Sequence, residues 1–210
     1  MAEPTIDPHR IADVAALEAL YGQPAETSLR KEVDHIHPMY RKMIEVSPFA
    51  VLATSGPDGL DVSPRGDAPG FVVVQDEHTL LLPDRRGNNR IDSLRNVLAD
   101  PRVSLIFLIP GVGETLRVNG RATISVAPDL LQRFVVNGKA PATVLVVKVD
   151  TVFFQCSKAL VRSRLWDAAA QVDRRSLPST GTMLSALTEA TIDADTYDQA
   201  LPARVQANLY

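Results

Sequence analysis

Short apolar runs separated by turn residues dominate the middle of the chain. Their lengths and alternation predict seven strands, at Phe49–Ser55, Leu60–Arg65, Phe71–Val74, Thr79–Leu82, Val103–Leu108, Glu114–Val126 and Thr143–Gln155. The sequence Gly56-Pro-Asp-Gly59 predicts a hairpin between the first two strands, and Gly120 predicts a bulge or bend in a long strand. Short turns with few helices between strands favour a mainly β fold, an antiparallel barrel with flanking helices, over a parallel α/β sheet.

Helical spacing of apolar residues is confined to the flanks and a few connections. Helices are predicted at Ile11–Tyr21, at Pro38–Glu45, from Arg90 onward, at Pro128–Val136, within Ser157–Ala170, and once or twice in the tail from Leu177 to Tyr210. The chain therefore divides into an N-terminal helical extension (residues 1–38), a barrel domain (39–167) and a C-terminal helical tail (168–210).

Composition removes several classes of function. The 210 residues carry a formal net charge of −3, which argues against a general nucleic-acid binder, and no apolar stretch is long enough to span a membrane. The polar start lacks the pattern of a signal peptide, and the single cysteine, Cys156, excludes an internal disulfide, so a reducing cytoplasm is the expected compartment. Cys156 is interpreted as a packed small side chain, with a redox thiol as the alternative. The four histidines form no recognisable metal-ligand set.

Candidate chemistry begins in the stretch Leu80–Ala99. A buried strand stops at Pro83, a charged turn follows, and a helix is expected near Arg90 with Asn88 or Asn89 as its cap. Free backbone N–H groups, the positive end of the helix dipole and nearby arginines suit a phosphate group. The alternative is an ordinary capped helix with solvated arginines.

A second polar segment, Ser63-Pro-Arg-Gly-Asp67, ends one predicted strand. Pro64 removes a ladder donor and Gly66 permits unusual backbone angles, so this segment could face a flat ligand; the alternative is a surface loop with an Arg65–Asp67 pair. Antiparallel neighbours could bring Ser63–Asp67, Pro83–Arg90 and Thr115–Arg117 to one end of the barrel. No nucleophile–base pair or nucleotide-binding glycine motif accompanies them, so catalytic residues stay unassigned and a cofactor with its own chemistry is favoured.

Several segments together resemble the pyridoxamine 5′-phosphate oxidase-like flavoproteins, in particular the subgroup of probable FMN-dependent proteins of unassigned substrate. They are Phe49–Ser55, Ser63–Asp67, Leu82–Arg85, Gly87–Arg90, Glu114–Gly120, Cys156–Ala159 and Arg162–Trp166. The resemblance implies a six-stranded antiparallel split barrel that forms a homodimer, with FMN in clefts between the subunits. It also implies an FMN-dependent oxidoreductase acting on a small molecule.

The resemblance also assigns site residues. Asn88, Asn89 and Arg90 fall where the family grips the FMN phosphate, and Pro83 is assigned to the same cofactor site. The segment with Ser63, Arg65 and Asp67 resembles the strand beside the flavin ring. The remaining matched positions are Thr115, which resembles a position that reaches the flavin of the opposite subunit, and Arg164 and Trp166, which resemble a segment that closes the cleft.

One departure from the family concerns its substrate. The oxidases bind pyridoxamine phosphate with a C-terminal Arg-x-His motif, whereas this chain has no histidine after His78. The departure argues against pyridoxamine phosphate oxidation and not against FMN binding. Two alternatives stay open: the same fold with a deazaflavin (haem is disfavoured by the lack of histidine in the matched segments), and a flavin-binding or sensory module without turnover.

Overall fold

The computed structural model describes residue 7 and residues 9–210, which form two separate units. The first unit, up to Glu32, contains the helices α1 (Val14–Tyr21) and α2 (Glu26–Arg30). The second unit, Val33–Tyr210, contains the sheet and all other helices. No helix in the described part of the chain has both the length and the apolar character needed to cross a bilayer.

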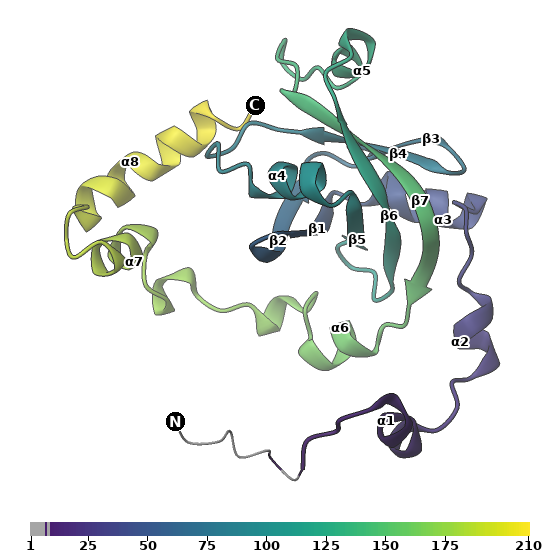
Figure 1. The fold of residues 1–210 in the computed structure, drawn as a ribbon. Coiled ribbons are helices and arrows are strands. Elements are labelled where there is room, and N and C mark those ends of the chain that lie inside the picture. The colour runs from purple at the N-terminus through teal and green to yellow at the C-terminus, as the bar shows by residue number, and fades with distance from the viewer. Residues whose placement is uncertain (1–6, 8) are drawn as a thin grey trace. The chain divides into compact units, whose positions relative to one another are not determined.

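One antiparallel sheet forms the second unit (Figure 1). Its strands are β1 (Phe49–Gly56), β2 (Gly59–Gly66), β3 (Val73–Asp76), β4 (Thr79–Asp84), β5 (Arg102–Leu108), β6 (Thr115–Ser125) and β7 (Thr143–Gln155). Their order is β2-β1-β5-β6-β7-β4-β3. The seven strands among the described residues confirm the hydrophobic pattern, and they are one more than the six that the resemblance implied. The predicted hairpin is confirmed, since Gly56 pairs with Gly59 across a two-residue turn.

The core lies inside the curl of this sheet. Alternate residues of β1, β5 and β7 point inward, whereas β4 is buried on both faces. Leu52, Leu80, Leu105, Phe107 and Leu116 are fully buried. Two helices close the interior: α3 (Pro38–Val46) contributes the buried Ile44, and α4 (Asp92–Ala99) contributes the buried Val97. Burial of this apolar surface is the main stabilising contribution to the barrel.

The sheet curls without closing. β2 forms one edge, and β3, which pairs with β4 only as far as Leu81, forms the other. No strand pairing joins β2 to β3 or β4 among the described residues. The last residues of β4, Leu82 to Asp84, therefore face a split in the barrel where backbone hydrogen bonding stops.

The rest of the second unit consists of short helices outside the sheet. Of these, α5 (Pro128–Arg133) packs beside β7, and α6 (Lys158–Ser163) follows the end of β7. The chain then runs away from the sheet through α7 (Thr180–Leu187) and α8 (Ala194–Ala207), and its C-terminus returns to the sheet (Figure 1). The helices α7 and α8 confirm the prediction of one or two helices between Leu177 and Tyr210.

The predicted start of the helix after β4 is wrong by two residues. α4 begins at Asp92, and its N-cap is Ile91, whose side chain offers no capping oxygen. Asn88 instead accepts a hydrogen bond from the backbone N–H of Arg90 (3.0 Å), which forms a turn before the helix. An asparagine side chain competes for a nearby N–H in either arrangement, so the sequence does not distinguish a cap from a turn.

Gly120 confirms the expected bulge. The β6–β7 register shifts between Asn119 and Gly120, and a Cβ atom at Gly120 would lie 2.2 Å from the Lys148 carbonyl oxygen. We expect Gly120→Ala to reduce the free energy of unfolding by about 3 kcal/mol, because backbone has to shift to relieve this overlap. Urea unfolding measures the loss. Gly87→Ala is the control, since nothing lies within 4 Å of a Cβ there; an equal loss in both variants would contradict the prediction.

Candidate functional site

Two arginine–carboxylate pairs bridge the split in the barrel. Asp61, Ser63 and Arg65 share one side of β2, as its burial pattern alternates. Arg65 donates to Asp84, at the end of β4, over 2.5 Å, and only 16% of its side chain is exposed. At the other end of this row, the Ser93 hydroxyl of α4 donates to Asp61 (2.7 Å).

The second pair, Asp67 and Arg85, lies directly after the C-terminal ends of β2 and β4. Nε of Arg85 donates to the carboxylate of Asp67 over 2.7 Å, and the Asp67 side chain is only 5% exposed. A terminal nitrogen of Arg85 also donates to the Phe134 carbonyl (2.5 Å). Side chains thus join the C-terminal ends of β2 and β4, where no backbone hydrogen bonds connect the two strands.

Tyr210 completes this second pair. Its hydroxyl donates to Asp67 over 2.7 Å, and the Arg85 guanidinium lies over its ring, 5.5 Å from the centroid. The backbone oxygen of Tyr210 accepts from Lys139 Nζ (2.9 Å). The C-terminal residue is therefore held at the split by three contacts.

These contacts set the ionisation of Asp67. Burial by itself would raise the pKa of this carboxyl. The hydrogen bonds from the Tyr210 hydroxyl, the Ala68 N–H and Arg85, together with the Arg85 charge, outweigh burial and lower the pKa below its usual value. The same hydrogen bond raises the pKa of the Tyr210 phenol. Asp67 is thus a buried carboxylate that stays ionised near neutral pH.

The segment after β4 is tied to β2 on both sides of Ser63. The Arg65–Asp84 pair fixes its beginning, and the Asp61–Ser93 hydrogen bond fixes its end. It contains Asn88, Asn89 and Arg90, which are all exposed, and it leads into the N-terminus of α4. The predicted group of Ser63, Arg65 and this segment therefore lies around one short stretch of β2.

Arg90 lies at the α4 end of this group. Its side chain is 79% exposed and pairs with Asp92 (2.5 Å), and it borders a cavity of about 300 Å³ with Asp61 and Asn96. The hydrogen bond and charge of Asp92 raise the pKa of Arg90. Arg65 and Arg90 thus pair with different carboxylates, so an anion between them would have to compete with both.

One donor at the site lacks a partner. Nε of Arg65 is buried without a hydrogen bond in the described structure. A buried, unsatisfied guanidinium N–H is costly, and an acceptor such as a phosphate oxygen would satisfy it. The residues present therefore fit a phosphate-bearing ligand at the split.

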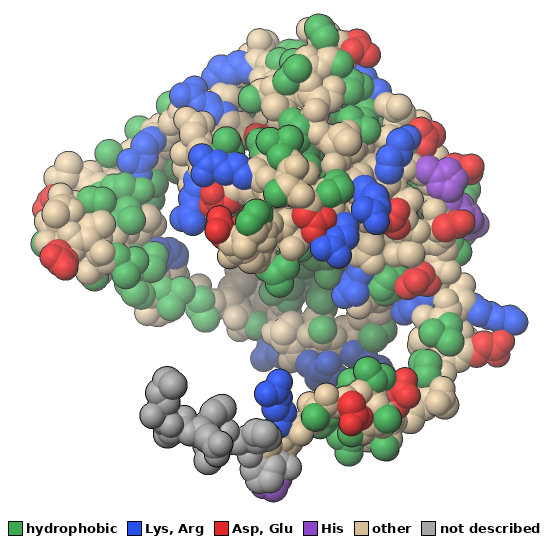
Figure 2. Space-filling model, in the orientation of Figure 1, with side chains coloured by type: hydrophobic (Ala, Val, Ile, Leu, Met, Phe, Trp, Pro, Cys, Tyr) green, Lys and Arg blue, Asp and Glu red, His purple; other side chains and the backbone are tan. Residues whose placement is uncertain are grey.

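Charge on this face is compensated rather than uniformly basic. Figure 2 shows Lys and Arg side chains beside Asp and Glu side chains over the region of α4, with neither sign forming a continuous patch. The arrangement favours recognition of one positioned anion over attraction of any polyanion.

Three of the other predicted residues, Thr115, Arg164 and Trp166, lie apart from this group within one chain, whereas Pro83 lies next to it. Pro83 is buried in β4, beside Asp84. Thr115 begins β6 and is 4% exposed. Arg164 pairs with Asp167, and the Trp166 indole donates to the Val112 carbonyl over 2.8 Å. Neither Arg164 nor Trp166 bonds to the Ser63–Arg90 group among the described residues.

The outer face of the sheet is partly apolar. Side chains at paired positions form a row across four strands: Val51, Ile106, Arg117 and Phe153. The next row is polar, because Ser104 donates to Asn119 and Asn119 donates to Thr151. A shallow hollow of about 320 Å³ lies along this second row. Apolar side chains on this face therefore stay half-buried in the single chain.

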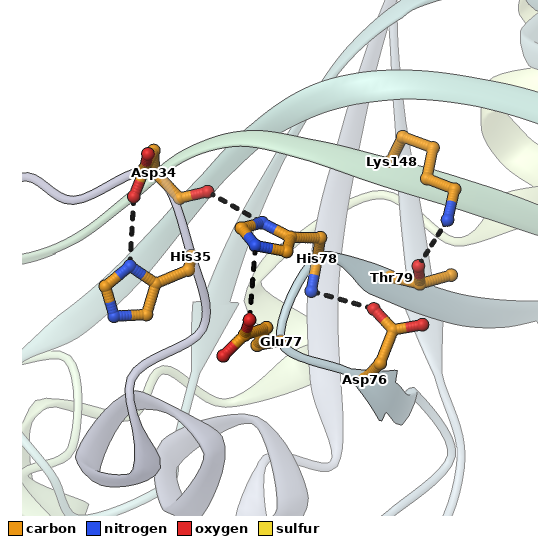
Figure 3. Close-up of polar contacts among 7 residues, drawn as sticks. All are labelled: Asp34, His35, Asp76, Glu77, His78, Thr79 and Lys148. Atoms are coloured by element: carbon orange, nitrogen blue, oxygen red, sulfur yellow. Dashed lines mark hydrogen bonds and ion pairs between the residues drawn. The ribbon is translucent and has the colours of Figure 1, made fainter.

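Cys156 and the histidines lie outside the group. Cys156 is exposed, so its interpretation as a packed small side chain is wrong. Figure 3 shows Asp34 between two histidines: its carboxylate contacts His35 (3.0 Å), its carbonyl contacts His78 (3.2 Å), and the His35 hydrogen bond lowers the pKa of Asp34. Within the described residues no three His, Cys, Asp or Glu side chains are placed to hold a metal ion.

The sequence analysis assigned no role in the site to Asp61, Asp84 or Tyr210. Asp84 and Asp61 supply the carboxylates that hold Arg65 and Ser93, and Tyr210 caps Asp67 from a position 143 residues away in sequence. The alternation along β2 could have identified Asp61, because it shares a face with Ser63 and Arg65. No local pattern connects Tyr210 to Asp67.

A family model described as pyridoxamine 5′-phosphate oxidase matches residues 36–156, more than half of the chain. None of the curated proteins compared with the chain matches it.

Solved structures give weaker likenesses. HupZ of Group A Streptococcus is 18% identical over 58% of this chain and 95% of its own, with a TM-score of 0.47. General Stress Protein 26 of Bacillus anthracis is 19% identical over 54% of this chain and 88% of its own, with a TM-score of 0.39. A related protein of Clostridium acetobutylicum, from the pyridoxinephosphate oxidase family, is 13% identical over 55% and 84%, with a TM-score of 0.42. At these values the likenesses support no functional argument.

The ionised Asp67 predicts an acid-sensitive fold. Its pKa is lower in the folded chain than in the unfolded chain, so its stabilising contribution is present above about pH 4 and is lost as the pH falls further. We expect Asp67→Asn to lower stability at pH 7 and to flatten the decline in stability below about pH 4. Urea unfolding at several pH values measures both. Asp58→Asn, at an exposed turn, serves as the control; a wild-type acid profile in Asp67→Asn would refute the assignment.

Proposed function

The chain belongs to the pyridoxamine 5′-phosphate oxidase family, and from that premise we propose that it is an FMN-dependent flavoprotein. It acts in the cytoplasm as an oxidoreductase on a small molecule, and a homodimer holds the cofactor in clefts between its subunits. Its partners include neither nucleic acid nor membrane.

The observation that carries the proposal is the environment of Arg65. Its guanidinium is buried at the split, fixed by Asp84, and keeps one N–H without an acceptor. A phosphate oxygen would supply that acceptor. The fixed geometry favours binding because little side-chain entropy is lost.

The proposed roles follow the placement of the residues. Ser63 and Arg65 on β2, with Asn88, Asn89 and Arg90 after β4, bind the phosphate. Backbone N–H groups before α4 add donors, and the helix dipole adds a favourable potential. Asp67 and Pro83 hold the two strand exits in place beside the cofactor. The residues that lie apart from the group within one chain contact the cofactor of the partner subunit: Thr115, Arg164 and Trp166.

The flavin supplies hydride transfer when it is bound. The chain contributes binding and orientation of the phosphate, a fixed electrostatic environment and a dry cleft. We assign no catalytic acid or base. The lack of any histidine after His78 leads us to propose a substrate other than pyridoxamine phosphate.

The outer face of the sheet supports the dimer proposal. Val51, Ile106 and Phe153 expose apolar surface across β1, β5 and β7, and Thr115 lies on the same side of β6 as Arg117. A partner seated on this face would bring its own residues towards Thr115. The cleft between two such subunits is the proposed position of the flavin ring.

We expect Arg65→Lys to weaken FMN binding about tenfold, because lysine keeps the charge beside Asp84 but loses the planar fork and its Nε donor. Quenching of flavin fluorescence during titration measures the Kd. Arg90→Ala should have a smaller effect, because the Arg90 side chain is already exposed and paired with Asp92. Arg30→Ala, whose side chain on α2 is 79% exposed and paired with Glu26, is the matched control.

Titration with FMN and with a deazaflavin, followed by addition of NADH or NADPH, separates the rival functions. A folded wild-type chain that ignores FMN contradicts the proposal. Preferential binding of a deazaflavin changes the cofactor and keeps the fold. FMN that binds but is never reduced by NADH or NADPH favours the binding or sensory module over the enzyme.

We expect Ile106→Asp to convert the dimer to a monomer, because it places a charge in the apolar row that the partner covers. Sedimentation velocity measures the mass. Leu98→Asp, at an exposed position of α4, should leave the mass unchanged. A monomeric wild-type chain, or an unaltered mass in Ile106→Asp, would rule out this interface.

A further inference from the structure

We propose that Tyr210 is a positioning residue for the phosphate site, and that docking of the C-terminal segment and binding of the phosphate are coupled. This inference rests on the proposed function and goes beyond it, because it makes occupancy of the site depend on a segment outside the barrel domain.

Three contacts carry the proposal. The Tyr210 hydroxyl donates to the buried Asp67 (2.7 Å), its ring lies under the Arg85 guanidinium (5.5 Å to the centroid), and its backbone oxygen accepts from Lys139 (2.9 Å). Asp67 in turn binds Arg85, which is the first residue after β4. Tyr210 therefore acts on the segment that carries Asn88, Asn89 and Arg90 through only two intervening side chains.

Tyr210 helps to fix the arrangement of Asp67 and Arg85. Asp67 accepts from Tyr210, Ala68 and Arg85, and a buried carboxylate that loses one of these donors keeps its desolvation cost. Without Tyr210, Asp67 and Arg85 could adopt other arrangements, and the start of the segment after β4 would be less well fixed. A preformed binding site binds its ligand more tightly than a mobile one, because it loses less conformational entropy on binding.

The path of the chain after α6 also involves Tyr210. α7 packs against α8, partly through the Gly181 N–H, which donates to Asp198 (2.7 Å). The segment from α6 to α8 runs away from the sheet and rejoins it at Tyr210 (Figure 1). Tyr210 is thus the point where this long segment meets the split.

Coupling between two equilibria is reciprocal. If docked Tyr210 favours the phosphate, the bound phosphate must favour docked Tyr210 by the same factor. Binding of FMN should therefore reduce the exposure of the C-terminal segment. Riboflavin, which has the same ring without the phosphate, should not.

The experiment compares Tyr210→Phe with Tyr197→Phe in the full chain. Both variants remove one hydroxyl from the C-terminal segment, but Tyr197 stacks with Arg204 on α8 and lies in none of the contacts at Asp67. Titration with FMN and with riboflavin gives two Kd values for each protein. We expect Tyr210→Phe to weaken FMN binding about tenfold with no change for riboflavin, and Tyr197→Phe to change neither.

The outcomes separate this inference from the proposed function. If the wild-type chain does not bind FMN, the proposed function fails and the inference fails with it. If the wild type binds FMN and Tyr210→Phe binds it equally well, only the inference fails. Equal weakening for FMN and riboflavin would show a general structural role and would also overturn it.

Limited proteolysis of the wild-type chain tests the reciprocal effect without any variant. We expect FMN to slow cleavage between Lys158 and Tyr210 and riboflavin to leave the cleavage rate unchanged. Equal cleavage rates with both flavins would overturn the coupling, even if Tyr210→Phe failed to fold.

Discussion

The fold depends on how a sheet that does not close is held at its split. Backbone pairing ends where β2 and β4 face each other, and the Arg65–Asp84 and Asp67–Arg85 pairs take its place. All four side chains are largely buried, so removal of one partner would leave an uncompensated charge at a cost of about 3–5 kcal/mol. The split is therefore a rigid feature. A ligand bound there, as we propose, would meet side chains rather than a closed ladder of backbone hydrogen bonds.

The same pairs limit what the site can bind. Each arginine already has a carboxylate partner, and Arg90 at the far end is paired with Asp92. A diffuse attraction for anions is therefore small. The binding that we propose depends instead on positioned donors, of which the buried Nε of Arg65 is the clearest. This arrangement favours a specific phosphate ester over nucleic acid and agrees with the net charge of −3.

The proposed phosphate site and the proposed subunit contact lie on different faces of the barrel. The split carries the polar pairs, whereas the outer face of β1, β5, β6 and β7 carries the apolar row from Val51 to Phe153. Antiparallel strands make this separation possible, because alternate residues of one strand face the core and the outside. β6 shows the division clearly: Leu116 and Val118 fill the core, and Arg117 and Asn119 lie on the outer face.

Local periodicity, turn chemistry and short motifs were enough to predict the strands, the β1–β2 hairpin, the Gly120 bulge and the family. The sequence also selected Ser63, Arg65 and the segment around Arg90 as neighbours, a grouping that the β2 contacts support. It placed the start of α4 two residues early and treated Cys156 as packed, since neither capping nor burial follows from local pattern alone. Only the tertiary structure joined Arg65 to Asp84 and Tyr210 to Asp67. Those contacts link residues far apart in sequence, and they exist because the curl of the sheet brings its two edges together.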